Sequence, residues 1–152
     1  MYSLLLTFHS YWRWVVLVAG VVATGHAWLG LIRGFAWLPR GRKLGLAFLV
    51  SVDVQLIVGL LLYAVFSPFA RIAFSNFGAA MKDANLRFWT VEHALTQLLA
   101  VALLHVGNVR VKKAPSDALR YRRFAVYASA ALVLMLIAIP WPMLDIGRPL
   151  FR

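Results

Sequence analysis

The chain consists of long apolar runs separated by short segments that are polar and basic. Four runs are long enough to cross the ~30 Å hydrocarbon core of a bilayer as helices rising about 1.5 Å per residue. They cover about residues 11–32, 44–66, 88–109 and 124–143. The first run has a possible start as early as Ser3, and Pro140 and Pro142 loosen or end the fourth. Because a bilayer offers the backbone no water to bond, these runs predict an all-α, integral membrane four-helix up-down bundle, a single transmembrane domain over residues 1–152.

The segment between the second and third runs, residues 67–87, is too polar to span and too apolar to be a free linker. Its apolar residues are Phe69, Ile72, Phe74, Phe77 and Met81. Their spacing suggests a short helix lying in the membrane interface at the outer end of the bundle. A plain surface loop is the alternative interpretation.

The loop charges predict the orientation of the bundle. Ten basic residues flank the first and third connections: Arg33, Arg40, Arg42, Lys43, Arg110, Lys112, Lys113, Arg120, Arg122 and Arg123. The second connection carries only Arg71, Lys82 and Arg87, against Asp83. Since Lys and Arg accumulate in cytoplasmic loops, this asymmetry predicts that both termini lie outside.

The composition supports this interpretation and excludes several others. The chain is 62% hydrophobic, with 16 Lys and Arg against 5 Asp and Glu, and its net charge is +11. The basic residues cluster beside apolar runs, so we expect a lipid bilayer and no nucleic acid as the partner. Other membrane subunits or a second copy are further expected partners. Because cysteine is absent, disulfides, thiolate metal sites and covalently attached c-type haem are excluded.

Ionisable residues are unusually frequent inside the predicted spans. They are Arg13, His26, Asp53, Glu92, His93 and His105, accompanied by Gln55 and Gln97. Each charged group at the centre of a span costs roughly 2.5–3.5 kcal/mol on insertion scales. These groups therefore either satisfy one another or hold a ligand, and Glu92, Asp53 and Gln97 are candidates for proton transfer or ion pairing.

Depth can be compared between the first and third spans because both run inward. Arg13 lies 20 residues before Arg33, and Glu92 lies 18 residues before Arg110, so their depths differ by only about 3 Å. This similarity predicts an Arg13–Glu92 ion pair. A purely structural role would explain such a pair equally well.

The four histidines form two candidate pairs by the same counting. His26 and His105 lie at nearly equal depth near the inner side, whereas His9 and His93 differ by about 10 Å unless the first helix tilts. Two histidines at one depth on different helices are the arrangement that axial ligation of a b-type haem requires. All four are therefore candidate iron ligands, and Arg13 is a candidate partner of a haem propionate. A hydrogen-bonded packing role is the alternative for each histidine.

Several sequence stretches carry a family resemblance. They are His9-Ser10-Tyr11-Trp12-Arg13-Trp14, Phe77-Gly78-Ala79-Ala80-Met81-Lys82-Asp83, Leu86-Arg87-Phe88-Trp89-Thr90-Val91-Glu92-His93 and Ile139-Pro140-Trp141. Together they resemble a family of small four-span bacterial membrane proteins usually labelled cytochrome b or cytochrome b-like. The resemblance implies haem b, a location in the bacterial inner membrane, and His9, Arg13, Glu92 and His93 as the motif residues.

Three function classes follow from these observations. The first is electron transfer by a b-type cytochrome between a quinone pool and a partner, with no catalytic residue assigned and enzymatic activity left open. The second is a non-catalytic accessory subunit of a larger respiratory or photosynthetic membrane complex. The third, a transporter or proton conductor, is weakly indicated because no repeat or broken mid-span helix is evident. No phosphate-binding glycine loop, nucleophile elbow or His-Glu-x-x-His motif occurs in the sequence.

Overall fold

All regular secondary structure is helical in the part of the chain that the computed structural model describes, residues 1–151. The elements are α1 (Tyr2–Arg33), α2 (Pro39–Leu61), the π-helix η1 (Leu62–Phe66), α3 (Pro68–Ser75), α4 (Phe77–Ala80), α5 (Ala84–Arg87), the π-helix η2 (Phe88–Glu92), α6 (His93–Lys112) and α7 (Asp117–Ile137). The predicted all-α class is confirmed.

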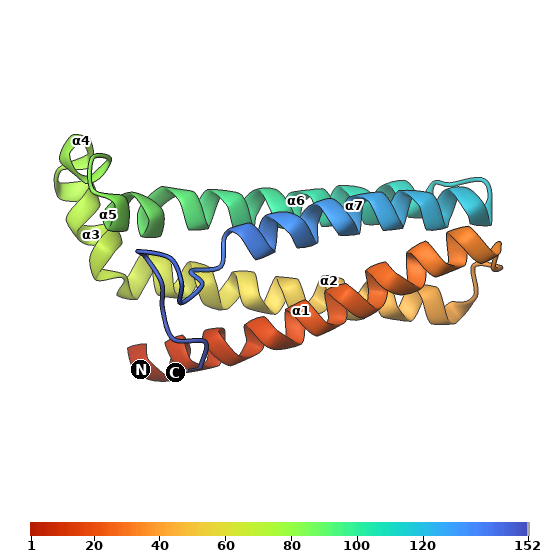
Figure 1. The fold of residues 1–152 in the computed structure, drawn as a ribbon, viewed down its shortest axis with the longest axis horizontal. Helices are drawn as coiled ribbons and strands as arrows, with labels where there is room; N and C mark the ends of the chain where they lie inside the picture. Colours follow the sequence, from red (N-terminus) through yellow and green to blue (C-terminus); the bar gives the residue numbers. More distant parts are fainter. Residues whose placement is uncertain (152) are drawn as a thin grey trace.

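The four long helices α1, α2, α6 and α7 lie side by side along the long axis of the molecule (Figure 1). The main packing contacts join α6 to α7, α1 to α2, and α1 to α7. The connections from α1 to α2 and from α6 to α7 lie at one end, whereas α3–α5 and both termini lie at the other (Figure 1). Both strongly basic segments are therefore at the same end of the molecule; the opposite end is called the terminal end below.

Three helical stretches are long and apolar enough to cross a membrane: Tyr2–Arg33, Pro39–Phe66 and Ala84–Lys112. α7 is different because it begins in a basic stretch and ends at Ile137, short of the predicted boundary at residue 143. Pro140 lacks a backbone N–H and disfavours helix in the residue before it, so the helix stops and turns follow. The indole of Trp141 then donates to the Leu136 carbonyl at 2.9 Å, which satisfies one terminal carbonyl of α7.

The segment between α2 and α6 is largely helical rather than a plain loop. Ser67 accepts a hydrogen bond from the backbone N–H of Ala70 at 3.1 Å, and Pro68 occupies the first turn of α3. Ala73 is buried while Ile72 and Phe74 are exposed, so α3 turns one small-residue face inward and presents apolar side chains outward. This is the pattern expected of a helix at an apolar boundary.

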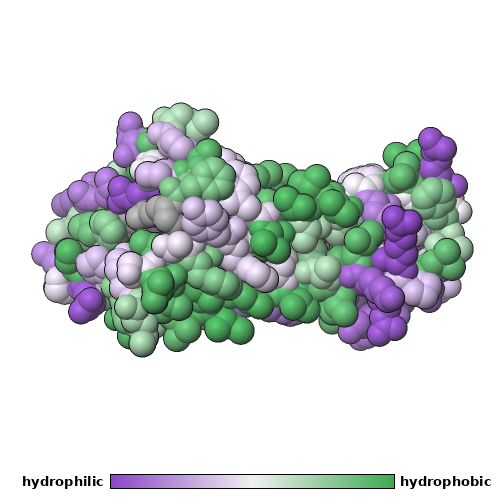
Figure 2. All heavy atoms as spheres, turned by 90° about the horizontal axis from the view of Figure 1, so that it is seen from below, coloured by the Kyte–Doolittle hydropathy of each residue, from purple (hydrophilic) through white to green (hydrophobic). Residues whose placement is uncertain are grey.

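Many contacts between the long helices are made by small residues, which surround the buried large side chains of Phe48, Leu104 and Tyr121, and many other large apolar residues face outward. Fully or nearly fully buried positions include Ala23, Ala27, Ala100, Ala125, Ala128 and Ala131. Outward-facing positions include Val18, Val21, Ile57, Leu95, Val133 and Ile137. Figure 2 shows a broad hydrophobic band between hydrophilic ends. This distribution is compatible with a lipid environment, in which small residues allow close helix packing.

Candidate functional site

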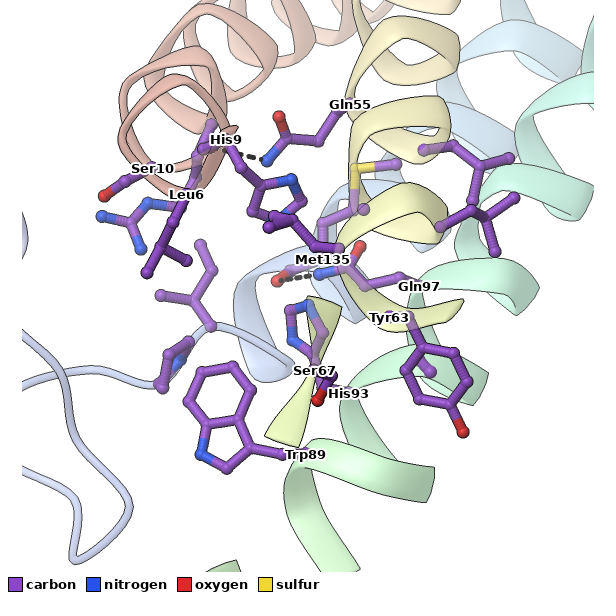
Figure 3. A pocket seen from close by; sticks show the side chains of 18 of the residues that line it. Leu6, His9, Ser10, Gln55, Tyr63, Ser67, Trp89, His93, Gln97 and Met135 are labelled. Atoms are coloured by element: carbon purple, nitrogen blue, oxygen red, sulfur yellow. Dashed lines mark hydrogen bonds between the residues drawn. The ribbon is translucent and has the colours of Figure 1, made fainter. Parts of the chain in front are cut away.

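A cavity of about 740 Å³ lies toward the terminal end of the long helices. Its walls come from α1, α2, η1, α3, η2, α6, the end of α7 and the C-terminal segment 138–151. Most of the lining is apolar. The polar and aromatic lining residues include His9, Arg13, Gln55, Tyr63, Phe69, Trp89, Thr90, His93, Gln97 and Arg148. Figure 3 labels six of them: His9, Gln55, Tyr63, Trp89, His93 and Gln97. This volume is in the range of binding sites for cofactors and small molecules.

His9 and His93 project into this cavity from α1 and α6 (Figure 3). Their ring centroids lie 6.5 Å apart and their planes make an angle of 67°. Counting along straight helices predicts a depth difference of about 10 Å between them. The structure removes this difference because α1 is inclined relative to α6 (Figure 1). The histidine pair at the terminal end is therefore brought together.

The backbone after α7 sets the orientation of His93. Its Nδ1 lies 2.8 Å from the carbonyl oxygen of Ala138. A carbonyl can only accept, so Nδ1 carries the hydrogen, and the neutral ring keeps its lone pair on Nε2. Phe88 and Trp89 pack against the ring, with centroids 5.8 and 5.7 Å away. A fixed tautomer with a carbonyl behind Nδ1 is the usual support of a metal-ligating histidine.

α2 provides the surroundings of His9. The side-chain amide of Gln55 donates to the His9 backbone carbonyl at 2.9 Å. A Cβ at Gly59 would lie 3.1 Å from His9 Cε1 and 3.7 Å from Nδ1, so the imidazole occupies space that this glycine leaves open. His9 Nδ1 is buried and has no hydrogen-bond partner among residues 1–151. A buried polar nitrogen of this kind calls for a ligand or water.

Two π-helical segments adjoin the cavity. η1 completes the α2 span, and η2 ends at Glu92, immediately before His93. The Tyr63 hydroxyl donates to the Thr90 carbonyl at 2.8 Å and so connects η1 with η2. Wider π-turns re-aim side chains within otherwise regular helices and are frequent at functional sites. No hydropathy pattern predicts them.

The C-terminal segment folds back over the cavity. Arg13 donates from Nη2 to the Leu150 carbonyl at 2.6 Å, and the Phe151 ring stacks on Trp14 at 5.5 Å. Arg148 and Pro149 contribute to the cavity wall. The sequence did not single out Arg148, because a lone arginine in a short proline-containing tail carries no spacing signal.

The predicted Arg13–Glu92 ion pair does not form in the part of the chain that the structure describes. Glu92 instead pairs with Arg87, with 2.6 Å between Oε1 and Nε. Arg87 lies five residues earlier, where the π-turn of η2 brings the two side chains onto one face. The local pair therefore replaces the interhelical pair that depth counting suggested.

The other two histidines, His26 and His105, do not form a pair with each other. His105 Nε2 lies 2.8 Å from Asp53 Oδ1 on α2, and both side chains are substantially exposed, at 48% and 38%. His26 lies beside Tyr121 instead, with ring centroids 6.0 Å apart. The depth-matched His26–His105 pair therefore does not meet across one gap as an axial pair would. Gln97 makes a long contact of 3.5 Å to the Met135 carbonyl in the cavity wall.

Axial ligation of a haem iron by two histidines requires a definite separation of the two imidazole rings. Metal–imidazole bonds of about 2.0 Å, with each ring centre roughly 1 Å behind its nitrogen, separate two opposed ring centres by about 6 Å. The observed 6.5 Å matches this separation. No cluster of three or more His, Cys, Asp or Glu suited to a metal ion occurs within residues 1–151. No family model, curated protein or solved structure matches the chain.

Proposed function

We propose that the protein is a b-type cytochrome-like membrane protein that holds one haem between His9 and His93. The observation that carries this proposal is the 6.5 Å separation of two imidazoles from different helices beside a cavity of about 740 Å³. The resemblance of the His9 and His93 stretches to small cytochrome b-like proteins supports the same assignment. Bound haem would supply one-electron redox chemistry whose potential depends on its axial ligands and their hydrogen bonds.

The surrounding residues would perform three tasks. The Ala138 carbonyl holds His93 in the tautomer that leaves Nε2 able to coordinate. Gly59 leaves room for the His9 ring, and the apolar lining excludes water from the cofactor faces. A haem held in this way would accept and donate single electrons. Because no catalytic acid or base is assigned, we propose that the protein transfers electrons between a quinone pool and a partner.

We further propose that α7 completes a four-span bundle in the bacterial inner membrane, with both termini outside. Its uncharged part from Phe124 to Ile137 has 14 residues, about 21 Å of helix, and the C-terminal segment covers the remaining depth. The position of both basic connections at one end supports this topology through the preference of Lys and Arg for the cytoplasmic side. The haem site would then lie in the outer half of the membrane.

The experiment is a dithionite-reduced minus oxidised spectrum of the purified protein, with extracted haem measured per chain. We expect one b-type haem per chain, lost in His9→Ala and in His93→Ala. His26→Ala and His105→Ala are matched controls because they remove a histidine from the same helices without touching the cavity. The assignment is wrong if protein prepared with added haem shows no absorbance, or if only the control variants lose it.

A second function, an accessory subunit of a larger membrane complex, is favoured by one observation. Asp53 and His105 form their pair on an exposed surface between spans rather than in the interior. A polar pair facing lipid is costly, so a neighbouring protein surface would explain it. Purification under mild detergent tests this: a single monodisperse copy that retains haem supports the first function, and a stable, colourless subunit found only with other chains supports the second.

A further inference from the structure

The Asp53–His105 pair lies on the outer surface of the helix bundle, where α2 meets α6. His105 Nε2 and Asp53 Oδ1 are 2.8 Å apart, and both side chains are substantially exposed. Neither side chain makes a second hydrogen bond within residues 1–151. Oδ2 of Asp53 and Nδ1 of His105 therefore remain for a partner beyond these residues, because a carboxylate and an imidazole each have more than one bonding atom.

Exposed apolar residues continue this surface along both helices. At successive intervals of three or four residues, the stripe on α2 passes through Leu46, Val50, Asp53, Ile57 and Leu60. The stripe on α6 passes at the same intervals through Leu95, Leu98, Ala102, His105 and Val109. Such intervals place residues on one side of a helix. The two stripes together are called the α2–α6 face, and each contains one ionisable residue.

The outward stripes of the other two long helices are different. They contain only apolar residues in the described part of the chain: Val15, Val18, Val22, Leu29 and Ile32 on α1, and Val126, Ala130, Val133 and Ile137 on α7. Lipid chains suit such stripes, but they offer no hydrogen bond to an ionisable pair. Among these four stripes, the two that form the α2–α6 face are therefore the ones that favour protein contact over lipid.

A second copy of the chain has the groups that complement this face. The proposed topology gives every copy the same orientation, so a two-fold axis along the membrane normal keeps each residue at its own depth. Asp53 and His105 share one depth because they are in contact. The other copy therefore presents the same acid and the same base at that depth. Asp53 of one copy then lies within the layer of His105 of the partner subunit.

We propose that the α2–α6 face binds a second copy of this chain, in a two-fold dimer whose centre contains the Asp53–His105 pairs of both subunits. Acidic and basic groups alternate around this centre, so that the polar atoms left over in one copy bond to those of the other. Hydrogen bonds between polar side chains of different helices stabilise such contacts in membranes. This inference rests on the proposed four-span topology and does not depend on bound haem.

The test uses the absence of cysteine, which allows one introduced thiol to report the contact. Ile57→Cys labels the α2–α6 face, and Val18→Cys on α1 is its matched control. The two residues are 60% and 62% exposed. Ile57 lies 14 residues after Lys43 and Val18 lies 15 residues before Arg33, so their depths differ by about 1.5 Å. Ala102→Cys reports the α6 side of the same face.

Each purified variant is reconstituted into excess lipid, because detergent competes for the apolar stripes, and is cross-linked by mild oxidation. We expect severalfold more disulfide-linked dimer from Ile57→Cys or Ala102→Cys than from Val18→Cys. Adding Asp53→Asn, which removes the carboxylate charge and keeps the side-chain shape, should lower the linked fraction severalfold. Circular dichroism of every variant reports that the helices remain folded.

Two results would overturn the dimer: no more linkage from either face variant than from Val18→Cys, or linkage that Asp53→Asn leaves unchanged. Linkage of the face variants only to a different chain in native membranes would also overturn it and would support the accessory-subunit function. Absorption spectra of the same samples test the haem separately. Haem without enhanced linkage overturns the dimer alone, and enhanced linkage without haem overturns the cytochrome assignment alone.

Discussion

Gly59 offers the sharpest test of the position of His9, because one added methyl group can separate ligand placement from folding. In Gly59→Ala the new Cβ would lie 3.1 Å from His9 Cε1, whereas ordinary contacts begin at 3.4 Å, so the ring must move by at least 3.4 − 3.1 = 0.3 Å. In the apoprotein this movement costs little, since the imidazole is the free end of a flexible side chain. Alanine also favours helix over glycine by roughly 0.5–1 kcal/mol.

The proposed haem-bound protein should respond differently, because an iron-bound ring could not move. Ligand distances tolerate changes of only about 0.2 Å. We therefore expect Gly59→Ala to weaken haem binding about tenfold or more, as loss of support around a metal ligand usually does. The apoprotein should keep its thermal stability, measured in the same detergent.

The matched control is Gly25→Ala, also within a long helix, where an added Cβ meets no atom within 4 Å. Haem affinity comes from Soret titration and stability from thermal unfolding monitored by circular dichroism. Our reasoning is refuted if Gly59→Ala binds haem as tightly as the wild type and with the same spectrum. It is also refuted if Gly25→Ala weakens haem binding to the same extent.

Three further perturbations address other parts of the molecule. A double-mutant cycle with Asp53→Ala and His105→Ala should give a coupling free energy of unfolding of about 0.6 kcal/mol, up to ~1.7 kcal/mol, with the haem spectrum unchanged. A coupling of zero would show that the pair does not join α2 to α6. Gly30→Val should destabilise the apoprotein by about 1–3 kcal/mol, because a side chain there overlaps the buried ring of Tyr121; an unchanged melting temperature would contradict this packing. Truncation after Ile139 removes one wall of the cavity, so haem should dissociate at least severalfold faster, as measured with a haem scavenger. An unchanged dissociation rate would show that the C-terminal segment does not cover the site.

The helical framework could be predicted from the apolar runs, since a bilayer-length stretch leaves the backbone few alternatives. The end of α7 could not be placed as well. Pro140 and Pro142 indicate a break, but not that the helix would already end at Ile137. The terminal carbonyls of α7 find partners in later residues, such as the indole of Trp141, and such contacts are not visible in a hydropathy pattern.

The histidine site illustrates the limit of depth counting. That counting treats helices as straight and parallel, so it favoured His26 with His105 and separated His9 from His93. The inclination of α1 and the π-turns of η2 reverse this preference, and both arise from tertiary packing (Figure 1). The predicted ion-pair partner of Glu92, Arg13, was wrong because the counting assumed regular α-helices. The π-turn instead brings the nearby Arg87 close to the Glu92 carboxylate.

The hydrogen bond from His93 to the Ala138 carbonyl also constrains how the protein is made. The two residues are 45 positions apart, and the carbonyl follows α7, which leaves the ribosome after α1, α2 and α6. A nascent chain that has inserted only α1, α2 and α6 contains both histidines but lacks the group that orients His93, as well as the tail that closes the cavity. The pocket is therefore complete only once α7 and the segment after it have been synthesised, and the proposed haem would load at that late stage of biogenesis.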